Sequence, residues 1–284
     1  MKHYQIISRY LLMKVKDHFL TQEEFEIKET TIAGIYKTSP VPENLSKYYD
    51  SKDYISHHQD SGSLKEKLYK FLQNFNLNYK RKILVDFVGL NKKILDYGCG
   101  AGEFVKYIEK DFITFGFEPS ESAKQYAIGK VQQTTIIDNL DFINDGTLDA
   151  ITLWHVFEHV ENQDEMLNKF HSKLKENGVL IIAVPNPTSY DALKYKEFWA
   201  AYDVPRHIYH FSKSGMEKLM NNENWKIKKI KPLLLDSFYI SMLSEKYQKS
   251  ALSWVKGMIF GLISNIKASK TGEYSSLIYI IEKK

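Results

Sequence analysis

The sequence predicts an α/β protein with a doubly wound, mostly parallel β-sheet and an antiparallel last strand. Three observations support this fold class. The 284 residues are 43% hydrophobic, which is enough for a large buried core. From Lys93 onward, short apolar runs alternate with helical patterns, as in successive strand, helix and strand units. The final apolar run, SLIYIIEK, is similar in type to the preceding WKIKKIK and is expected to pair with it as the last strand.

Apolar runs separated by turns and helical patterns give the expected elements of the main part of the chain. The expected strands are KILDYG (93–98), FITFGFE (112–118), TTIID (134–138), LDAITLW (148–154), GVLIIAV (178–184), WKIKKIK (225–231) and SLIYIIEK (276–283). The expected helices are GEFVKYIEK (102–110), SESAKQYAIGK (120–130), NQDEMLNKFHSKLKENG (162–178) and SKSGMEKLMNN (212–222).

The domain organisation follows from a change of pattern near the amino terminus. Residues 1–65 combine strand-like alternation, a turn with two prolines and an aromatic, polar stretch, so we interpret them as an N-terminal appendage and a candidate substrate lid. A helix from Ser63 to about Asn78 is expected to lead into a main domain at 66–284. Two helical patterns at about 233–273 form an insertion before the last strand.

Composition excludes several classes of partner. The net charge is +4 and the lysines are scattered, so nucleic-acid binding receives little support. The single cysteine, Cys99, excludes an internal disulfide, and the amino terminus lacks a secretory pattern, so the cytoplasm is expected. The apolar stretch at 250–266 is too short for a stable membrane insertion. We expect an amphipathic helix that packs on its own core or on a second subunit of a homodimer, rather than on a lipid surface.

The stretch LDYGCGAGEF (95–104) follows the first strand of the main domain and has three glycines at alternate positions. In an open parallel sheet, the turn after this strand borders the ligand. A dinucleotide site would need a third glycine where the chain has Glu103, and a carboxylate at a helix start disfavours a pyrophosphate. The second expected strand ends at Glu118, 22 residues after Asp96, where a carboxylate typically holds ribose hydroxyls. Together these features favour a cofactor without phosphates.

The motifs ILDYGCGAGEF, FGFEPS, GTLDAITLWHVFEHV and NGVLIIAVPNP, in this order, resemble the class I S-adenosylmethionine-dependent methyltransferases. The resemblance covers roughly residues 65–230 and the terminal strand, and it implies a Rossmann-like fold with S-adenosylmethionine as the cofactor. The EHV element and DVPRHIYHFS make the chain most similar to the branch that contains the ubiquinone-biosynthesis O-methyltransferases. This branch implies a small-molecule acceptor that is methylated at oxygen.

The resemblance implies a cofactor-binding role for nine residues. These are Asp96, Gly98, Gly100, Gly102, Glu118, Asn139, Leu140, Trp154 and His155. Asp96 would orient the glycine turn or reach the methionine amino group, and Glu118 would accept hydrogen bonds from both ribose hydroxyls. Asn139 and Leu140 would flank the adenine, with Asp138 a less certain neighbour.

The stretch HVFEH (155–159) matches the sequence motif of a zinc-peptidase helix, in which two histidines and a glutamate share one helix. Here it directly follows an expected strand among the cofactor-binding motifs, so we disfavour a peptidase. Ubiquinone-type enzymes are associated with a divalent metal near an ExxEH element. Here Glu158 and His159 match that element, but His155 replaces its first glutamate. We assign no metal ligand from sequence. A metal near Glu158 and His159, and a purely bracing role for these two residues, both stay open.

The segment DVPRHIYHFS (203–212) supplies the candidate catalytic residues His207 and His210, since a free histidine titrates near neutrality and this fold commonly places acceptor contacts there. His207 is preferred as the general base because it matches the related branch. The alternative is an ordered loop that closes onto the sheet. Nearby aromatic residues would either line the acceptor pocket or fasten the appendage to the core; they are Trp199, Tyr202, Tyr49, Tyr54 and His57.

The sequence therefore predicts a cytoplasmic methyltransferase that acts on a small molecule. The main alternative is a non-catalytic S-adenosylmethionine-binding or scaffold protein of the same fold. A nicotinamide oxidoreductase is disfavoured by Glu103. A lipid or quinone acceptor would suit the apolar helix near Trp254, and a sugar would suit the tyrosines.

Overall fold

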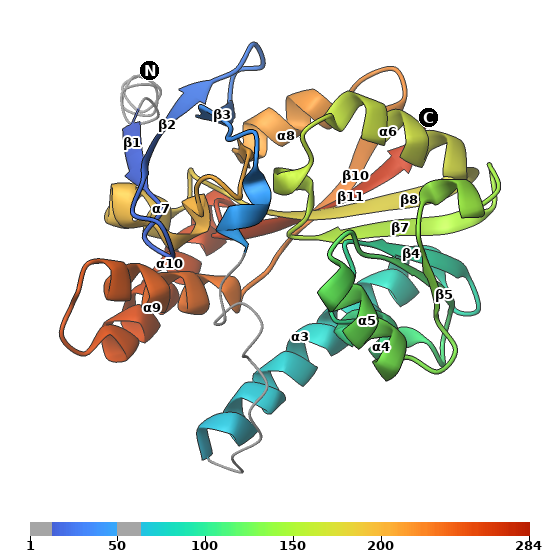
Figure 1. Cartoon of the computed structure of the whole chain (residues 1–284), viewed down its shortest axis with the longest axis horizontal. Coiled ribbons are helices and arrows are strands. Elements are labelled where there is room, and N and C mark those ends of the chain that lie inside the picture. Colours follow the sequence, from blue (N-terminus) through green and yellow to red (C-terminus); the bar gives the residue numbers. More distant parts are fainter. Residues whose placement is uncertain (1–12, 50–63) are drawn as a thin grey trace.

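The structure is a computed structural model that describes residues 13–49 and 64–284, and it contains two β-sheets (Figure 1). The larger sheet has seven strands in the order β10-β11-β8-β7-β4-β5-β6. These strands are β4 (Lys93–Tyr97), β5 (Ile113–Phe117), β6 (Thr135–Ile137), β7 (Leu148–Trp154), β8 (Leu174–Pro185), β10 (Trp225–Pro232) and β11 (Ser276–Lys283). All seven expected strands are thereby confirmed.

The pairing of these strands is mostly parallel. Strands β6, β5, β4, β7 and β8 run parallel to their neighbours, and β11 lies antiparallel between β8 and β10. The expected pairing of the last two strands is confirmed. Strand order reverses at β4, since the chain continues outward to β6 and then returns to β7 on the other side of β4. Such a reversal is where open α/β sheets bind their ligands.

Alternating side chains of the large sheet bury two separate cores. On one face, Ile94, Ala150 and Ile181 pack with residues of α3 (Leu64–Val88) and α4 (Glu103–Ile108). On the other face, their sequence neighbours pack with α6 (Gln163–Lys173) and α8 (Lys213–Met220). Successive strand residues point to opposite faces, so nearly continuous apolar runs fit a sheet that is covered on both sides.

Two helix boundaries differ from the sequence prediction. The helix expected to end near Asn78 continues to Val88, because Ile83 and Leu84 are fully buried under the sheet. The helix expected at 162–178 ends at Lys173, because Leu174 already pairs with Leu148 as the first residue of β8. The remaining helix of the cofactor half, α5 (Glu121–Lys130), follows the expected range.

The smaller sheet joins the appendage to the main domain. Its order is β1-β2-β3-β9, and its strands are β1 (Met13–Lys16), β2 (Glu24–Glu29), β3 (Ile35–Ser39) and β9 (Tyr209–Phe211). The 3₁₀ helix η1 (Leu45–Tyr48) follows β3. Arg206, just before β9, is buried and pairs with Asp17 of the appendage at 2.9 Å and with Asp203 at 2.6 Å. The appendage is thus completed by a strand that comes from the segment DVPRHIYHFS.

Residues 190–202 form a packing layer between the appendage and the insertion. The elements of this layer are α7 (Tyr190–Tyr195), η4 (Lys196–Phe198) and η5 (Ala200–Tyr202). Trp199 and Tyr202 are each 2% exposed and pack in the same apolar cluster as Val15 and Phe25 of the appendage. Both aromatic residues therefore fasten the appendage to the core, which is the second of the two roles considered from sequence.

The insertion consists of two packed helices, α9 (Asp236–Tyr247) and α10 (Ser253–Thr271). A Cβ atom at Gly257 would lie 2.4 Å from the Cα of Met242, so the two helices approach too closely for a side chain there. Three large apolar side chains of α10 are exposed, those of Trp254, Met258 and Leu262. Within 13–49 and 64–284, helices both apolar enough and long enough to cross a membrane are absent.

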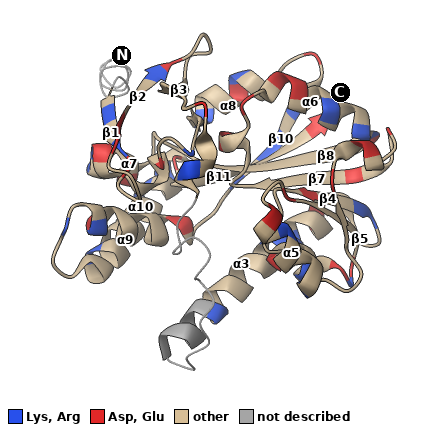
Figure 2. Cartoon of the chain, in the orientation of Figure 1, with Lys and Arg blue, Asp and Glu red and all other residues tan. Residues whose placement is uncertain are grey.

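Basic and acidic residues are interspersed over the elements of both sheets (Figure 2). Oppositely charged side chains often pair locally, as in Lys124 with Asp138 and Lys175 with Asp149. Mixed charge of this kind lacks the one-sided basic field that attracts nucleic acid.

Candidate cofactor and acceptor site

The glycine turn connects β4 to α4 at the carboxyl edge of the large sheet. Gly98, Gly100 and Gly102 have positive φ angles of 78°, 54° and 80°, in the left-handed region that glycine adopts readily. The backbone N–H groups of Gly98 and Cys99 both donate to the carbonyl of Phe117, at 2.8 and 2.9 Å. The end of β5 therefore holds the turn in place. Cys99 is buried beside Val105 and Ala127, in the packing role expected for it.

The three glycines serve two different purposes. A Cβ atom at Gly98 would lie 2.5 Å from a methyl group of Val156, and one at Gly102 would lie 3.0 Å from Ala127. These two positions are glycine because the protein itself packs against them. A Cβ atom at Gly100 would meet no atom of residues 13–49 and 64–284 within 4 Å. Gly100 thus presents bare backbone to open space, where a ligand can approach closely.

Glu118 lies directly beside this open backbone. Its Oε2 accepts a hydrogen bond from the N–H of Gly100 and its Oε1 accepts one from the N–H of Ser120, both at 2.9 Å. Each carboxylate oxygen has about two acceptor positions, so each keeps one for a ligand. The two backbone donors fix the orientation of the carboxylate beside the open backbone of Gly100.

Asp96 lies underneath the turn and is 3% exposed. Thr152 donates a hydrogen bond of 2.6 Å to its Oδ1. Burial raises the pKa of Asp96 to about 7, against the opposing effects of the Thr152 hydrogen bond and the Lys80 charge. A buried carboxyl group of this kind is well placed to gain a charge when a cationic group binds nearby.

Lys80, on α3, is a residue of this edge that sequence reasoning missed. Its Nζ lies 4.6 Å from the ring centroid of Trp154, and Asp96 and Asp236 both attract its charge. Trp154 packs edge-on against Phe104, and its buried Nε1 has no hydrogen-bond partner among the residues that the structure describes. Nothing in the sequence distinguishes Lys80 from the other lysines of its helix, since only the folded chain brings it to the sheet edge.

The residues expected to flank the adenine follow β6 at the same edge. The side chain of Asn139 accepts from the N–H of Asp141 at 2.9 Å and begins the 3₁₀ helix η2 (Leu140–Phe142). Leu140 is 8% exposed and packs in the core under this turn. Asp138 pairs with Lys124 at the surface. The strands β4, β5, β6 and β7 thus bring all nine expected cofactor residues to a single edge.

His155 adopts a positive φ of 59° immediately after β7. Its Nε2 lies 2.8 Å from Asp236 Oδ2, and its Nδ1 lies 3.4 Å from Glu158 Oε1. Although burial lowers the pKa of a histidine, the two carboxylates raise the pKa of His155 to about 10. Only Phe157–His159 form a helix here, the 3₁₀ turn η3, so His155 and His159 do not share a helical face. The stretch HVFEH therefore lacks the structure of a zinc peptidase.

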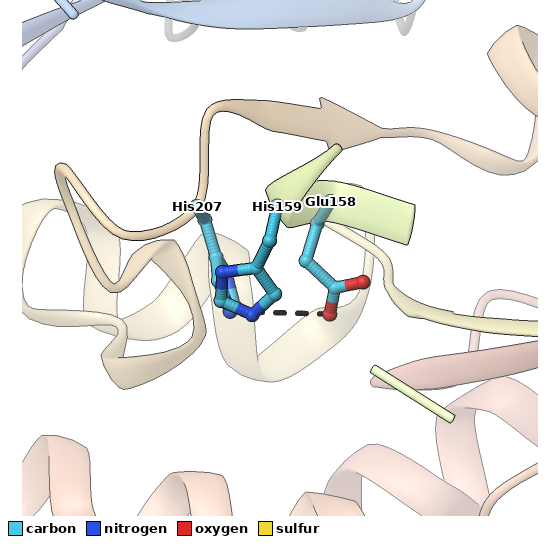
Figure 3. A group of neighbouring side chains, drawn as sticks. All are labelled: Glu158, His159 and His207. Atoms are coloured by element: carbon cyan, nitrogen blue, oxygen red, sulfur yellow. Dashed lines mark ion pairs between the residues drawn. The ribbon is translucent and has the colours of Figure 1, made fainter. Parts of the chain in front are cut away.

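Glu158 and His159 come from η3, and His207 comes from the loop before β9; the three side chains converge (Figure 3). His207 Nε2 is 3.9 Å from Glu158 Oε1, and the rings of His159 and His207 are 4.7 Å apart. Burial, and then the neighbouring His159, lower the pKa of His207 to about 4, so His207 is neutral at physiological pH. A neutral imidazole can accept a proton.

His210 lies in β9, and its Nε2 is 3.0 Å from Thr38 Oγ1 of β3. Burial, with a smaller effect of His207, lowers the pKa of His210 to about 3. His210 thus lies behind His207, against the appendage. The hydroxyl of Tyr49 is 3.1 Å from His159 Nδ1, so the appendage also reaches the cluster. Tyr54 and His57 lie outside the described residues.

A doubly wound sheet, a bare glycine backbone at its switch point and an adjacent carboxylate are typical of class I methyltransferases. The comparisons with known proteins agree. The chain matches the family model described as "Methyltransferase domain" over residues 58–230, more than half of its length, and it belongs to this family. The class expected from sequence, an S-adenosylmethionine-dependent methyltransferase, is confirmed. A search of curated protein sequences gives no match.

Solved structures share the fold at low sequence identity. Geranyl diphosphate C-methyltransferase from Streptomyces coelicolor A3(2), in complex with Mg²⁺, geranyl diphosphate and S-adenosyl-L-homocysteine, is 14% identical with a TM-score of 0.53, over 84% of this chain and 96% of that one. Mycolic acid cyclopropane synthase CmaA1, complexed with S-adenosylhomocysteine and CTAB, is 15% identical with a TM-score of 0.50, over 72% and 83%. The first is a C-methyltransferase and the second a cyclopropane synthase, and both complexes contain small molecules.

Proposed function

We propose that this protein transfers the methyl group of S-adenosylmethionine to an oxygen atom of a small-molecule acceptor. The observation that carries the proposal is the open backbone at Gly100 beside the fixed carboxylate of Glu118. The edge offers close backbone contact and ribose acceptors. The first residue of α4, next to this backbone, is Glu103, and a carboxylate at a helix start disfavours a pyrophosphate. A cofactor without phosphates fits these residues.

The roles proposed for the cofactor residues follow from their positions. Glu118 accepts from both ribose hydroxyls, and Asn139 and Leu140 border the adenine after β6. Asp96 lies under the turn and Lys80 lies over Trp154, so this end of the edge has one group of each sign for the amino and carboxylate groups of the methionine. When bound, S-adenosylmethionine supplies a sulfonium methyl group that is already a strong electrophile. The chain has to orient the acceptor, exclude water and remove its proton.

His207 is the residue that we propose for proton removal. Its Nδ1 lies 2.9 Å from the carbonyl of Ala201, which can only accept, so Nδ1 carries the hydrogen and Nε2 keeps its lone pair. Nε2 faces the cluster with Glu158, whose charge stabilises the imidazolium that forms. His210 packs behind His207 and supports its position. The proposal for oxygen, rather than carbon or nitrogen, rests on this available base and on the sequence resemblance to the ubiquinone-type branch.

The domain roles are also proposals. We infer that the appendage, residues 1–65, and the insertion at 233–273 form the acceptor side of a methyltransferase domain at 66–284, because Tyr49 and Asp236 reach the histidines there. We further propose a cytoplasmic protein that acts without nucleic acid, and a homodimer that covers the exposed side chains of α10.

The experiment is an acceptor search with purified protein. A cell extract is incubated with the protein and isotopically labelled S-adenosylmethionine, and mass spectrometry identifies metabolites that gain one labelled methyl group. We expect the labelled product to be an ether or ester, to disappear with His207→Gln, and to persist with the remote His171→Gln. A protein that binds S-adenosylmethionine by calorimetry, yet labels no metabolite in extracts from several growth conditions, would be the non-catalytic alternative. A product labelled at carbon or nitrogen would overturn the O-methylation proposal.

A further inference from the structure

Three side chains at the acceptor side of the site have the arrangement of metal ligands. Glu158, His159 and His207 each offer one ligand atom, and these atoms lie within 4.8 Å of one another. Figure 3 shows the two rings and the carboxylate turned toward a common point, with Glu158 and His159 on the η3 turn and His207 on the loop that leads to β9. The three residues come from segments almost fifty positions apart, so the convergence is a property of the fold.

The hydrogen bonds of the two histidines leave the correct ring nitrogens available. His159 Nδ1 lies 2.8 Å from the carbonyl of Arg206, and His207 Nδ1 lies 2.9 Å from the carbonyl of Ala201. A carbonyl oxygen accepts only, so both Nδ1 atoms carry the hydrogen and both Nε2 atoms have free lone pairs. Metal-binding histidines are held in this way, with the outer nitrogen bonded to a carbonyl or carboxylate. Arg206 is itself fixed by Asp17 and Asp203, so the outer shell is rigid.

Glu158 supplies a second, independent observation. It is 1% exposed, and neither of its carboxylate oxygens accepts a hydrogen bond within the described chain. Its closest cationic contact is His155 Nδ1 at 3.4 Å, an ion pair without hydrogen-bond geometry. Buried carboxylates normally accept several hydrogen bonds or bind a cation, because an unsatisfied buried charge is costly. A cation between Glu158 and the two imidazoles would satisfy this carboxylate.

The ligand atoms of the three side chains are spaced almost closely enough to bind one metal ion. Metal–ligand bonds of about 2.0 to 2.2 Å place neighbouring ligand atoms roughly 3 to 3.5 Å apart. The measured separation of His207 Nε2 and Glu158 Oε1 is 3.9 Å. Side-chain rotations that move each ligand atom by less than about 1 Å would therefore complete the coordination. His159 is only half-buried, which leaves a side open for a further ligand such as the acceptor.

His155 is not part of the cluster, although it occupies the position of the first glutamate of an ExxEH element. Its Nε2 forms an ion pair of 2.8 Å with Oδ2 of Asp236, which lies on the insertion. The site thus has two imidazoles and one carboxylate where an ExxEH element offers mostly carboxylate. Imidazole nitrogen suits zinc, iron and related ions, whereas magnesium prefers oxygen ligands. The donor set disfavours magnesium.

We propose that Glu158, His159 and His207 form a site for a divalent transition-metal ion, with His155 outside the coordination sphere. The binding stands independently of the proposed methyl transfer, and only its catalytic meaning rests on that function. When bound, such an ion would supply a Lewis acid that lowers the pKa of an acceptor hydroxyl. In that state His207 Nε2 is a ligand, and the metal-free protein is the form in which it serves as a base.

The test uses the full-length protein after treatment with a chelator. Cobalt(II) is titrated in, because its visible absorption reports nitrogen ligands and low coordination number directly. We expect one ion per chain, competition by zinc, and no displacement by millimolar magnesium. Glu158→Gln, His159→Gln and His207→Gln should each weaken cobalt binding by roughly a hundredfold or more, since loss of an outer-shell partner alone costs 10- to 100-fold. His155→Gln should bind cobalt within about threefold of the wild type.

Two further measurements separate binding from folding and from function. Thermal melts and calorimetry with S-adenosylhomocysteine on the same variants show whether each is folded and keeps its cofactor site. Cobalt binding that survives His207→Gln or Glu158→Gln, or is lost only in His155→Gln, would overturn the proposal, as would displacement by magnesium. Loss of cobalt binding with intact cofactor binding supports it. If instead S-adenosylhomocysteine fails to bind while cobalt binds as described, the methyltransferase proposal fails and the metal site stands.

Discussion

Gly100 offers the sharpest test of the cofactor site, because the chain contains a matched control. Gly100 has a φ of 54° and open space where a Cβ atom would lie, and Gly146, in a distant turn before β7, has a φ of 67° and the same open space. Substitution by valine should therefore lower the free energy of unfolding by a similar amount at the two positions. The left-handed conformation costs roughly 1 to 2 kcal/mol for a residue with a side chain, which lowers Tm by a few degrees in a chain of this size.

Cofactor affinity should separate the two variants. In Gly100→Val the added methyl groups occupy the space in which the cofactor is proposed to approach the backbone, whereas those of Gly146→Val point into solvent far from the edge. Overpacking of about 1 to 3 kcal/mol corresponds to a loss of about 5- to 150-fold in affinity. Isothermal titration calorimetry with S-adenosylhomocysteine measures the loss. Equal affinities in the two variants, with equal losses of Tm, would show that no ligand lies against Gly100.

Three further predictions concern other parts of the molecule. Glu118→Ala should reduce S-adenosylhomocysteine affinity by roughly 100-fold or more, at about 1.5 to 3 kcal/mol for each ribose hydrogen bond, and Glu121→Ala on the exposed start of α5 should leave it unchanged in the same calorimeter. Gly257→Ala should lower Tm because its Cβ meets the backbone of α9 at 2.4 Å, and Gly129→Ala, which has open space in a helix, should raise Tm slightly; equal shifts would contradict the packing argument. The folded-state pKa of Asp96, raised to about 7, means that its ionisation costs stability progressively from about pH 4 to pH 7 and fully above. The free energy of unfolding of Asp96→Asn should thus rise relative to that of the wild type as pH rises over that range, by up to the order of 4 kcal/mol, and its Tm should rise with it. A constant difference in Tm would refute the raised pKa.

The large sheet was predictable because its strands carry their own signals. Runs such as 148–154 and 178–184 are apolar on both faces, and in the structure neighbouring residues such as Leu180 and Ile181 enter opposite cores. The glycine turn and Glu118 were predictable for the same reason, since their spacing is local to two strands. These local patterns also carried the family resemblance that implied the methyltransferase class and its cofactor.

The acceptor side was much less predictable because it is built from distant segments. Strand β9 has only three residues and gains its strand character by pairing with β3, about 170 positions earlier. Lys80 and Asp236 have no spacing pattern that links them to Trp154 or His155, and the fold alone brings them together. His155 likewise combines a positive φ with ion pairs to Asp236 and Glu158 that its sequence neighbours do not indicate. Non-local contacts of this kind leave no trace in composition or periodicity.

The shared strand β9 constrains how this protein can be varied by evolution or by engineering. Replacement of the appendage by that of a relative would remove the partner of β9 and leave the buried Arg206 without Asp17. The loop at 203–212 would then have to change with it, and so would the position of His207. The glycine turn and Glu118 take no part in the pairing of β9 with β3. Under the proposed division of roles, a change of acceptor requires joint exchange of the appendage and the β9 segment, while the glycine turn and Glu118 are kept.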